Sequence, residues 1–136
     1  MANRFSEGFN GFKMKKIIYI SIIILFVNGC TKELVISNPG YTIGVIYEYV
    51  PGWAEGPTSV RFEYVVNNKT YHTGYTNGDH GWKIPGNAGY KQGDMFMVQY
   101  DIENIKIARM LFDYPVKDTT DYERYIEQFR INPPKK

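Results

Sequence analysis

Residues 60–75 read VRFEYVVNNKTYHTGY and carry the strongest structural signal in the chain. Every second residue of the first half is apolar or aromatic, as in a strand with one buried face. Asn67 and Asn68 follow, and both tolerate the positive φ that a two-residue type I′ turn requires. The second half alternates as well, which places Tyr71 and Tyr75 on one face of a returning strand. This stretch therefore predicts a β-hairpin.

Alternating patterns on both sides of the hairpin predict three further strands. They cover residues 45–50, 95–100 and 105–112. Tyr47 and Tyr100 lie on the faces that we expect to be buried, so both are predicted to belong to the core. Aromatic residues make up 16% of the chain, and this excess favours β-structure.

The last element has the periodicity of an amphipathic helix. Its apolar stripe has the spacing i, i+3, i+4 and i+7 and consists of Tyr122, Tyr125, Ile126 and Phe129. Thr120 and Glu123 have the spacing of a capping box. The fold class that we predict is mainly β, with one C-terminal amphipathic helix covering an open end or edge of the sheet. The sheet is expected to be a small antiparallel five-stranded barrel or rolled sheet, similar to an OB or SH3 fold.

The chain has 136 residues, which is enough for one small domain and too few for two separate cores. Residues ahead of Met14 look like an extension from a start codon assigned too early. The predicted organisation is a signal peptide over 1–29 (with 1–13 as this extension), a lipidated cysteine and tether over 30–40, a β-domain with its helix over 41–131, and a tail over 132–136.

A secretory signal precedes the domain. Basic residues at 13–16 are followed by an apolar run over 17–27, which is shorter than the about 20 residues that cross a bilayer. The run ends in Val27-Asn28-Gly29-Cys30, which resembles the lipobox of bacterial lipoproteins, with Asn28 where Ala or Ser is usual. The resemblance implies that Cys30 is lipidated and becomes the mature N-terminus. The alternative is an uncleaved anchor beside a free cysteine.

Thr31 follows the cysteine, where an Asp would retain a lipoprotein in the inner membrane. The resemblance therefore implies the outer membrane of a Gram-negative bacterium, on its periplasmic face or at the cell surface. It also implies that the membrane is a partner, through the lipid on Cys30.

The charge of the mature part differs from that of the whole chain. The chain has 16 basic and 14 acidic residues, and four of the basic and one of the acidic residues precede residue 31. Residues 31–136 therefore carry 12 basic and 13 acidic residues, a net charge of −1. Because these charges are also interspersed, we expect no nucleic-acid partner.

Residues 93–116, GDMFMVQYDIENIKIARMLFDYPV, resemble a segment of small uncharacterised bacterial membrane-anchored proteins and lipoproteins. The shared pattern is Gly-Asp, an alternating strand ending in Val-x-Tyr, a turn with Asn, and a strand ending near Asp-x-Pro. The relatives tend to have prolines around the Asn, where this chain has Glu103 and Ile105. The resemblance implies a common fold and brings no catalytic residue.

Two segments rich in turn residues, 52–57 and 76–94, are the predicted binding loops. Each contains a tryptophan, and loop aromatics are frequent binding hot spots. The alternative is that each tryptophan closes one end of a small barrel. The candidate binding residues are Trp53, Trp82, Tyr75 and Tyr90.

The reactive side chains predict no catalytic centre, no metal site and no cofactor. Cys30 is the only cysteine in the chain, and no Gly-x-Ser-x-Gly elbow occurs. Glu48 and Glu63 are the carboxylates that an envelope-glycan hydrolase could use, and they define the enzymatic alternative. Thr119, within Asp-Thr-Thr, resembles an O-glycosylation site of some Gram-negative phyla.

Three function classes follow. We expect a non-catalytic binding or inhibitor module that contacts an envelope protein or glycan through the two loops. The alternatives are a structural accessory of an outer-membrane complex, which would use a sheet edge or the helix, and the hydrolase.

Overall fold

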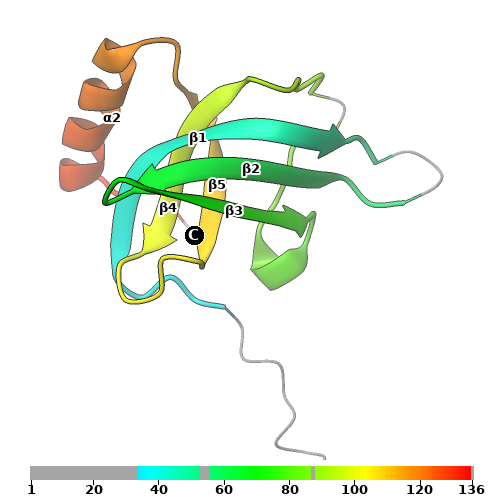
Figure 1. The fold of residues 1–136 in the computed structure, drawn as a ribbon, viewed down its shortest axis with the longest axis horizontal. Coiled ribbons are helices and arrows are strands. Elements are labelled where there is room, and N and C mark those ends of the chain that lie inside the picture. The colour runs from blue at the N-terminus through cyan, green and yellow to red at the C-terminus, as the bar shows by residue number, and fades with distance from the viewer. Residues whose placement is uncertain (1–33, 53–55, 87, 136) are drawn as a thin grey trace, which may run out of the picture. The chain divides into compact units, whose positions relative to one another are not determined.

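The structure is a computed structural model that describes residues 34–52, 56–86 and 88–135 (Figure 1). The predicted signal peptide, the start extension, the lipidation site Cys30 and the candidate Trp53 lie outside the described residues. In the described part, no helix combines the length and apolar character that crossing a membrane requires.

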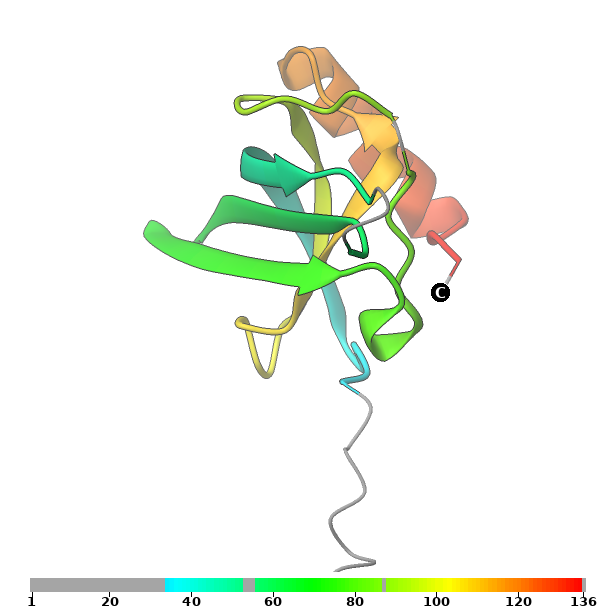
Figure 2. The same cartoon turned by 90° about the vertical axis from the view of Figure 1, so that its right-hand side faces the viewer.

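Five antiparallel strands form one sheet in the order β3-β2-β1-β4-β5. The strands are β1 (Pro39–Val50), β2 (Ser59–Val66), β3 (Lys69–Thr76), β4 (Met95–Asp101) and β5 (Ala108–Pro115). The sheet curls around a common interior (Figure 2). Its edge strands β3 and β5 do not pair with each other in the segments that the structure describes. The prediction of a mainly β fold is confirmed, in the form of a rolled sheet that is not closed into a barrel.

The predicted hairpin is confirmed in its strands and in its turn. Asn67 and Asn68 have φ angles of 52° and 61°, as a type I′ turn requires. Val66 pairs with Lys69 across the turn. The alternating residues of β2 are buried, and the exposed fraction of Phe62 is 0%.

The alternation of β1 is interrupted by a β-bulge at Tyr47. A bulge inserts one residue and so reverses the facing of the residues after it. Ahead of the bulge, Ile46 faces the interior of the roll and is fully buried, whereas Tyr47 is exposed, so the prediction that Tyr47 belongs to the core is wrong. After the bulge, Tyr49 packs against the interior. Tyr100 is half-buried and packs against the core. β1 also extends beyond the predicted strand 45–50 and includes the end of the predicted tether.

β5 begins later than the predicted strand 105–112 because the preceding turn is longer. The backbone N–H of Asp101 donates to the carbonyl of Ile107 at 3.0 Å, so the turn extends as far as Ile107. Ile105 consequently lies in the turn, where its carbonyl accepts a hydrogen bond from the Tyr64 hydroxyl at 2.6 Å.

Two hydrophobic clusters lie on the two faces of the sheet. The inner cluster is enclosed by the roll and includes Ile46, Val60, Phe62, Tyr64, Val98 and Met110. The outer cluster lies between the sheet and the C-terminal helix and contains Met97, Leu111, Val116 and Phe129. Adjacent residues of β4 and β5 contribute to different clusters, as expected for strands whose side chains alternate between faces.

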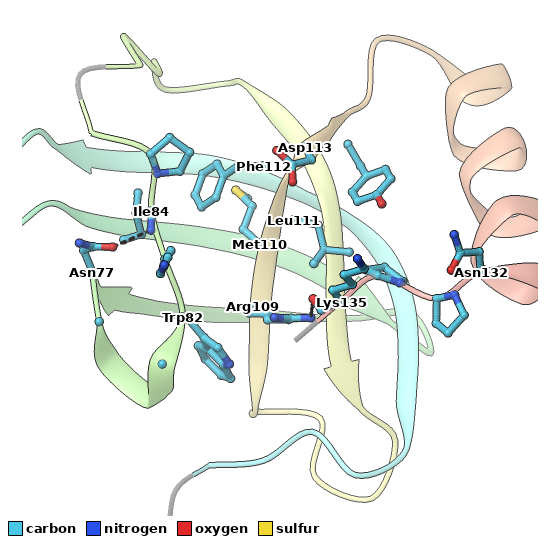
Figure 3. A pocket seen from close by; sticks show the side chains of 17 residues that line it. Asn77, Trp82, Ile84, Arg109, Met110, Leu111, Phe112, Asp113, Asn132 and Lys135 are labelled. Atoms are coloured by element: carbon cyan, nitrogen blue, oxygen red, sulfur yellow. Dashed lines mark hydrogen bonds between the residues drawn. The ribbon is translucent and has the colours of Figure 1, made fainter.

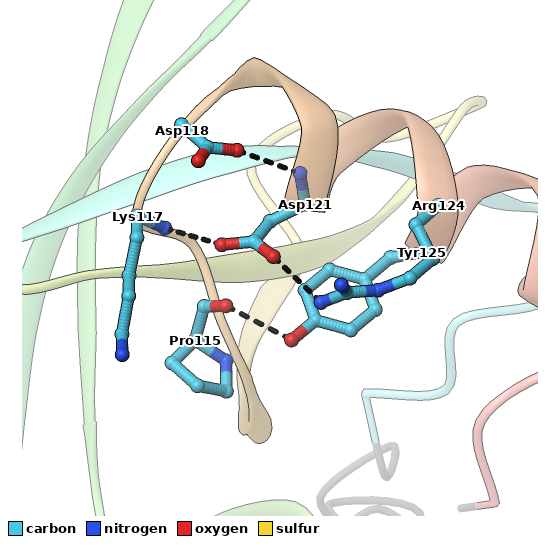
Figure 4. A network of polar contacts seen from close by, with 6 residues as sticks. All are labelled: Pro115, Lys117, Asp118, Asp121, Arg124 and Tyr125. Atoms are coloured by element: carbon cyan, nitrogen blue, oxygen red, sulfur yellow. Dashed lines mark hydrogen bonds and ion pairs between the residues drawn. The ribbon is translucent and has the colours of Figure 1, made fainter.

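The helix α2 (Thr119–Ile131) covers part of the outer face of the sheet, and its predicted apolar stripe packs there. It begins earlier than the predicted capping box indicates, because Asp118 is the N-cap. The Asp118 carboxylate accepts from the backbone N–H of Asp121 at 3.0 Å, and the Asp121 carboxylate accepts from that of Lys117 at 2.9 Å (Figure 4). This reciprocal pair satisfies donors that the start of a helix leaves free. The prediction that Thr120 caps the helix is therefore wrong.

Asp101 fastens the N-terminal end of the domain to the sheet. Its carboxylate accepts from the backbone N–H groups of Ser37 and Glu103, each at 2.8 Å. The bond from Ser37 is the main cause that holds the pKa of Asp101 below its ordinary value. The segment that leads toward the predicted lipid anchor is thus held by a buried, ionised carboxylate.

We expect Asp101→Asn to destabilise the domain at pH 7, because the amide has one acceptor oxygen in place of two. Its NH₂ group would then face one of the backbone N–H donors. The ordinary pKa of an aspartate is about 3.9, and that of folded Asp101 is lower. The ionised carboxylate of Asp101 therefore stabilises the fold fully at pH values above the ordinary pKa of about 3.9. This contribution is lost as the pH falls through the lower pKa of the folded state. The difference in the free energy of unfolding between wild type and variant, measured with urea, should become smaller below about pH 4. Glu123→Gln, on the exposed side of α2, is the control; a gap that does not vary with pH would contradict the prediction.

Candidate binding cleft

A cleft of about 920 Å³ lies between residues 77–85, the edge strand β5 and the C-terminal residues 132–135 (Figure 3). These three segments are far apart in the sequence. The first belongs to the predicted binding loop 76–94, and the last to the predicted tail. Residues 132–135, which belong to the predicted tail, therefore form one wall of the cleft.

The wall formed by residues 77–85 is fixed by local hydrogen bonds. The Asn77 side-chain oxygen accepts from the backbone N–H of Ile84 at 2.8 Å. The backbone N–H of Trp82 donates to the Asp79 carbonyl at 2.9 Å, and that of Gly78 donates to the Trp82 carbonyl at 2.8 Å. Gly78 has a φ of 93°, which favours glycine, and Ile84 is buried in the inner cluster. The glycine-rich segment is thus a held loop that presents Trp82 to the cleft.

Trp82 and Tyr75 are brought together, as two of the four candidate binding residues. Trp82 is half-buried and packs edge-on against Tyr75, with 5.2 Å between ring centroids. Tyr75 is buried, and its hydroxyl donates to the carbonyl of Met110 at 3.3 Å, which joins the two edge strands of the sheet. Burial also raises the pKa of Tyr75. Trp82 is therefore available for contact, whereas Tyr75 supports it from the core.

Tyr90 lies in a different aromatic group. Its ring is edge-on to Tyr49 at 5.4 Å and stacked on Phe112 at 5.0 Å, and burial raises its pKa. Phe112 itself lines the cleft, so Tyr90 supports a lining residue without lining the cleft. In the other predicted loop, 52–57, the two flanking residues are joined by a hydrogen bond. The backbone N–H of Gly52 donates to the Thr58 hydroxyl at 2.9 Å.

Arg109 is a lining residue that the sequence interpretation did not single out. Its side chain is buried on β5, where Nε donates to the Gln99 side-chain oxygen at 2.8 Å and Nη2 donates to the Lys135 carbonyl at 2.9 Å. The Gln99 amide in turn donates to the Tyr41 hydroxyl at 3.3 Å. The available signal was the alternation of β5, which places this arginine on the same face as the apolar Leu111.

The lining is locally positive. Lys83, Arg109 and Lys135 contribute cationic side chains, and Asp113 is the acidic residue among the lining residues. Arg109 and Asp113 lie at opposite ends of the labelled part of β5 (Figure 3). The cleft therefore has a cationic end next to the C-terminal residues and an acidic group toward its other end.

The remaining candidate residues lie outside the cleft. Glu48 forms an ion pair with Arg61 at 3.3 Å, and Glu63 lies 3.8 Å from His72, all on half-exposed or exposed side chains of the sheet. Thr119 is exposed as the first residue of α2, and its glycosylation stays a prediction. Over the described ranges, no group of three or more His, Cys, Asp or Glu side chains is arranged to hold a metal ion.

Comparisons of this chain with protein-family models, with curated proteins and with solved structures find no match.

Proposed function

We propose that this chain is a non-catalytic binding module of the Gram-negative cell envelope, anchored in the outer membrane by a lipid on Cys30. Its ligand is an extended polypeptide segment of another envelope protein, which binds in the cleft between residues 77–85 and β5. The observation that carries this proposal is that a predicted binding loop and an edge strand of the sheet meet in one cleft.

An edge strand favours a polypeptide over a glycan as the ligand. β5 pairs with β4 on one side, and no strand in the described part pairs with its other side. At Met110 the backbone carbonyl is already bonded to the Tyr75 hydroxyl, so an added strand would use the other backbone groups of this edge. Extended peptides commonly bind by adding a strand to such an edge, with neighbouring pockets selecting side chains. Trp82 and Phe112 provide the apolar surface for this selection.

The same geometry merges two of the hypotheses drawn from the sequence. A module acting through its loops and an accessory acting through a sheet edge would use the same cleft here. The helix gives less support to the accessory hypothesis, because its exposed side is charged, with ion pairs between Asp121 and Arg124 and between Glu127 and Arg130. Charged residues are depleted in the cores of protein–protein interfaces, so this side of the helix is a less suitable contact surface.

Photo-crosslinking in the native host tests the proposal. A benzophenone amino acid is placed at Lys83, which lines the cleft, and separately at Val65, which is exposed on β2 outside it. We expect a discrete adduct from the first position and none from the second, with the adduct peptide coming from an envelope protein. Identical adducts from both positions, or adducts from neither, would contradict the proposal.

We expect Trp82→Ala to reduce this crosslinking by about tenfold or more, because half-buried aromatic residues in a cleft are typical hot spots. A decrease in the thermal midpoint is also expected, since Trp82 packs against Tyr75. Tyr47→Ala, at an exposed aromatic residue outside the cleft, is the matched control. A lower thermal midpoint with unchanged crosslinking would mean that Trp82 only closes the roll.

A further inference from the structure

Arg109 is a buried cation whose hydrogen-bond acceptors are both neutral. Its exposed fraction is 9%, and the two acceptors are the side-chain oxygen of Gln99 and the backbone carbonyl of Lys135. No carboxylate of the described residues lies within ion-pair distance of its guanidinium. Buried charges are normally paired, because burying a charge without a partner is strongly unfavourable.

The guanidinium retains donors that could be used by a ligand. An arginine has five N–H groups, and the bonds to Gln99 and Lys135 use two of them, which leaves about three. The bond through Nε also fixes the plane of the group, since Gln99 is itself held by Tyr41. A planar guanidinium with free N–H groups is suited to a carboxylate, which it can bind through two parallel hydrogen bonds.

The surroundings of Arg109 favour an anion at the same place. Lys135 contacts Arg109 through its own backbone carbonyl, and Lys83 stands on the facing wall. The lining therefore carries three cations and one acid. Figure 3 shows Arg109 joined to Lys135, with Asp113 at the other end of the labelled part of β5. An acidic group on the ligand is therefore favoured at Arg109 and disfavoured at Asp113.

We propose that Arg109 is a carboxylate-binding site, and that the polypeptide segment bound in the cleft places an acidic group there. This inference rests on the proposed function, because it assigns a chemical class to one end of the ligand. The carboxylate can come from a chain terminus or from an Asp or Glu side chain. Amidation of the peptide C-terminus removes the first of these carboxylates and leaves the second intact.

Tryptophan fluorescence provides a direct assay. The chain has two tryptophans, so that Trp53→Phe leaves Trp82, in the wall of the cleft, as the only reporter. The full-length protein in detergent is titrated with acetyl-Ala-Ala, with its C-terminal amide, and with acetyl-Asp-Ala amide. We expect the free acid to bind at least about tenfold more tightly than its amide. Tight binding of the Asp peptide amide would indicate a side-chain carboxylate as the natural source.

Charge variants assign the effect to one residue. Arg109→Gln should bring the affinities for the acid and the amide to within about twofold, whereas Lys106→Gln, at an exposed lysine that does not line the cleft, should preserve the difference. Circular dichroism verifies that each variant folds. If Arg109→Gln does not fold, the Arg109 Nε–H resonance of the wild type is followed instead, and it should shift with the acid and not with the amide.

The outcomes separate this inference from the proposed function. The carboxylate site would be overturned if acetyl-Ala-Ala binds no more tightly than its amide and acetyl-Asp-Ala amide binds no more tightly than acetyl-Ala-Ala amide. Crosslinking from Lys83 would then still test, independently, whether the cleft binds a polypeptide. Selective binding of the acid without any crosslinked envelope protein would support the carboxylate site and contradict the proposed function.

Discussion

Replacing Phe62 with alanine is expected to lower the free energy of unfolding by about 3–5 kcal/mol. Phe62 has an exposed fraction of 0% and contacts the rings of Tyr64 and Tyr75, with centroids 5.8 Å and 6.2 Å away. The substitution removes apolar surface from the inner cluster and leaves a cavity that the enclosing sheet can fill only in part. Domains of this size are stable by only about 5–15 kcal/mol, so the variant loses a large share of its stability.

The matched control for this variant lies on the same strand. Val65 points outward from β2 with an exposed fraction of 51%, and Val65→Ala should change the free energy of unfolding by no more than about 0.5 kcal/mol. Urea unfolding of both variants, followed by circular dichroism at pH 7, gives the comparison. Similar small losses for the two variants would mean that the inner cluster is not the main core.

The sequence predicts the hairpin well because its information is local. The turn at Asn67 and Asn68 and the alternation beside it depend on residues that are neighbours in the chain. The facing of β1 depends on distant segments, because this strand pairs with β2 on one side and with β4 on the other, and the bulge at Tyr47 lies in its pairing with β2. A contact between parts of the chain that are so far apart leaves no periodic trace, and the alternation of β1 was therefore misinterpreted.

The start of the helix illustrates a different limit. Asp118 and Thr120 are both acceptable N-cap residues by type, so propensity alone cannot choose between them. The choice is made by the reciprocal bond from the Lys117 backbone to Asp121, and by the Tyr125 hydroxyl, which donates to the Pro115 carbonyl at 3.0 Å. These contacts fix the chain just ahead of the helix (Figure 4).

The wall of the cleft that is formed by residues 77–85 could be predicted from the sequence. The loop composition pointed to residues 76–94, and Trp82 indeed lines the cleft. Arg109 could not be identified as a site residue, because its role depends on Gln99 and Lys135, and the second of these partners belongs to a segment interpreted as a tail. Tyr90 was grouped with Trp82 by sequence proximity, and both pack against the inner cluster, but their rings have different partners, Phe112 for Tyr90 and Tyr75 for Trp82.

Phe129→Ala is expected to lower the free energy of unfolding of the helical region by about 3–4 kcal/mol. The exposed fraction of Phe129 is 4%, and its ring contacts Tyr41 and Tyr114 with centroid distances of 4.8 Å and 4.7 Å. It is the residue of α2 that enters the outer cluster most deeply, so its loss removes most of what holds the helix on the sheet. Gln128→Ala, at the exposed neighbouring position, is the control and should have little effect.

Hydrogen exchange distinguishes a local from a global loss. The outer cluster is separate from the inner one, so we expect the amides of α2 to lose protection in Phe129→Ala while those of β2 and β3 keep it. Residues 132–135 follow the helix directly and supply the carbonyl that Arg109 binds. Detachment of α2 therefore removes one wall of the cleft, and crosslinking from Lys83 should fall together with helix protection. Equal loss of protection in β2 and β3 would show instead that the helix and the sheet unfold as one unit, and the helix would then stabilise the whole domain rather than the cleft in particular.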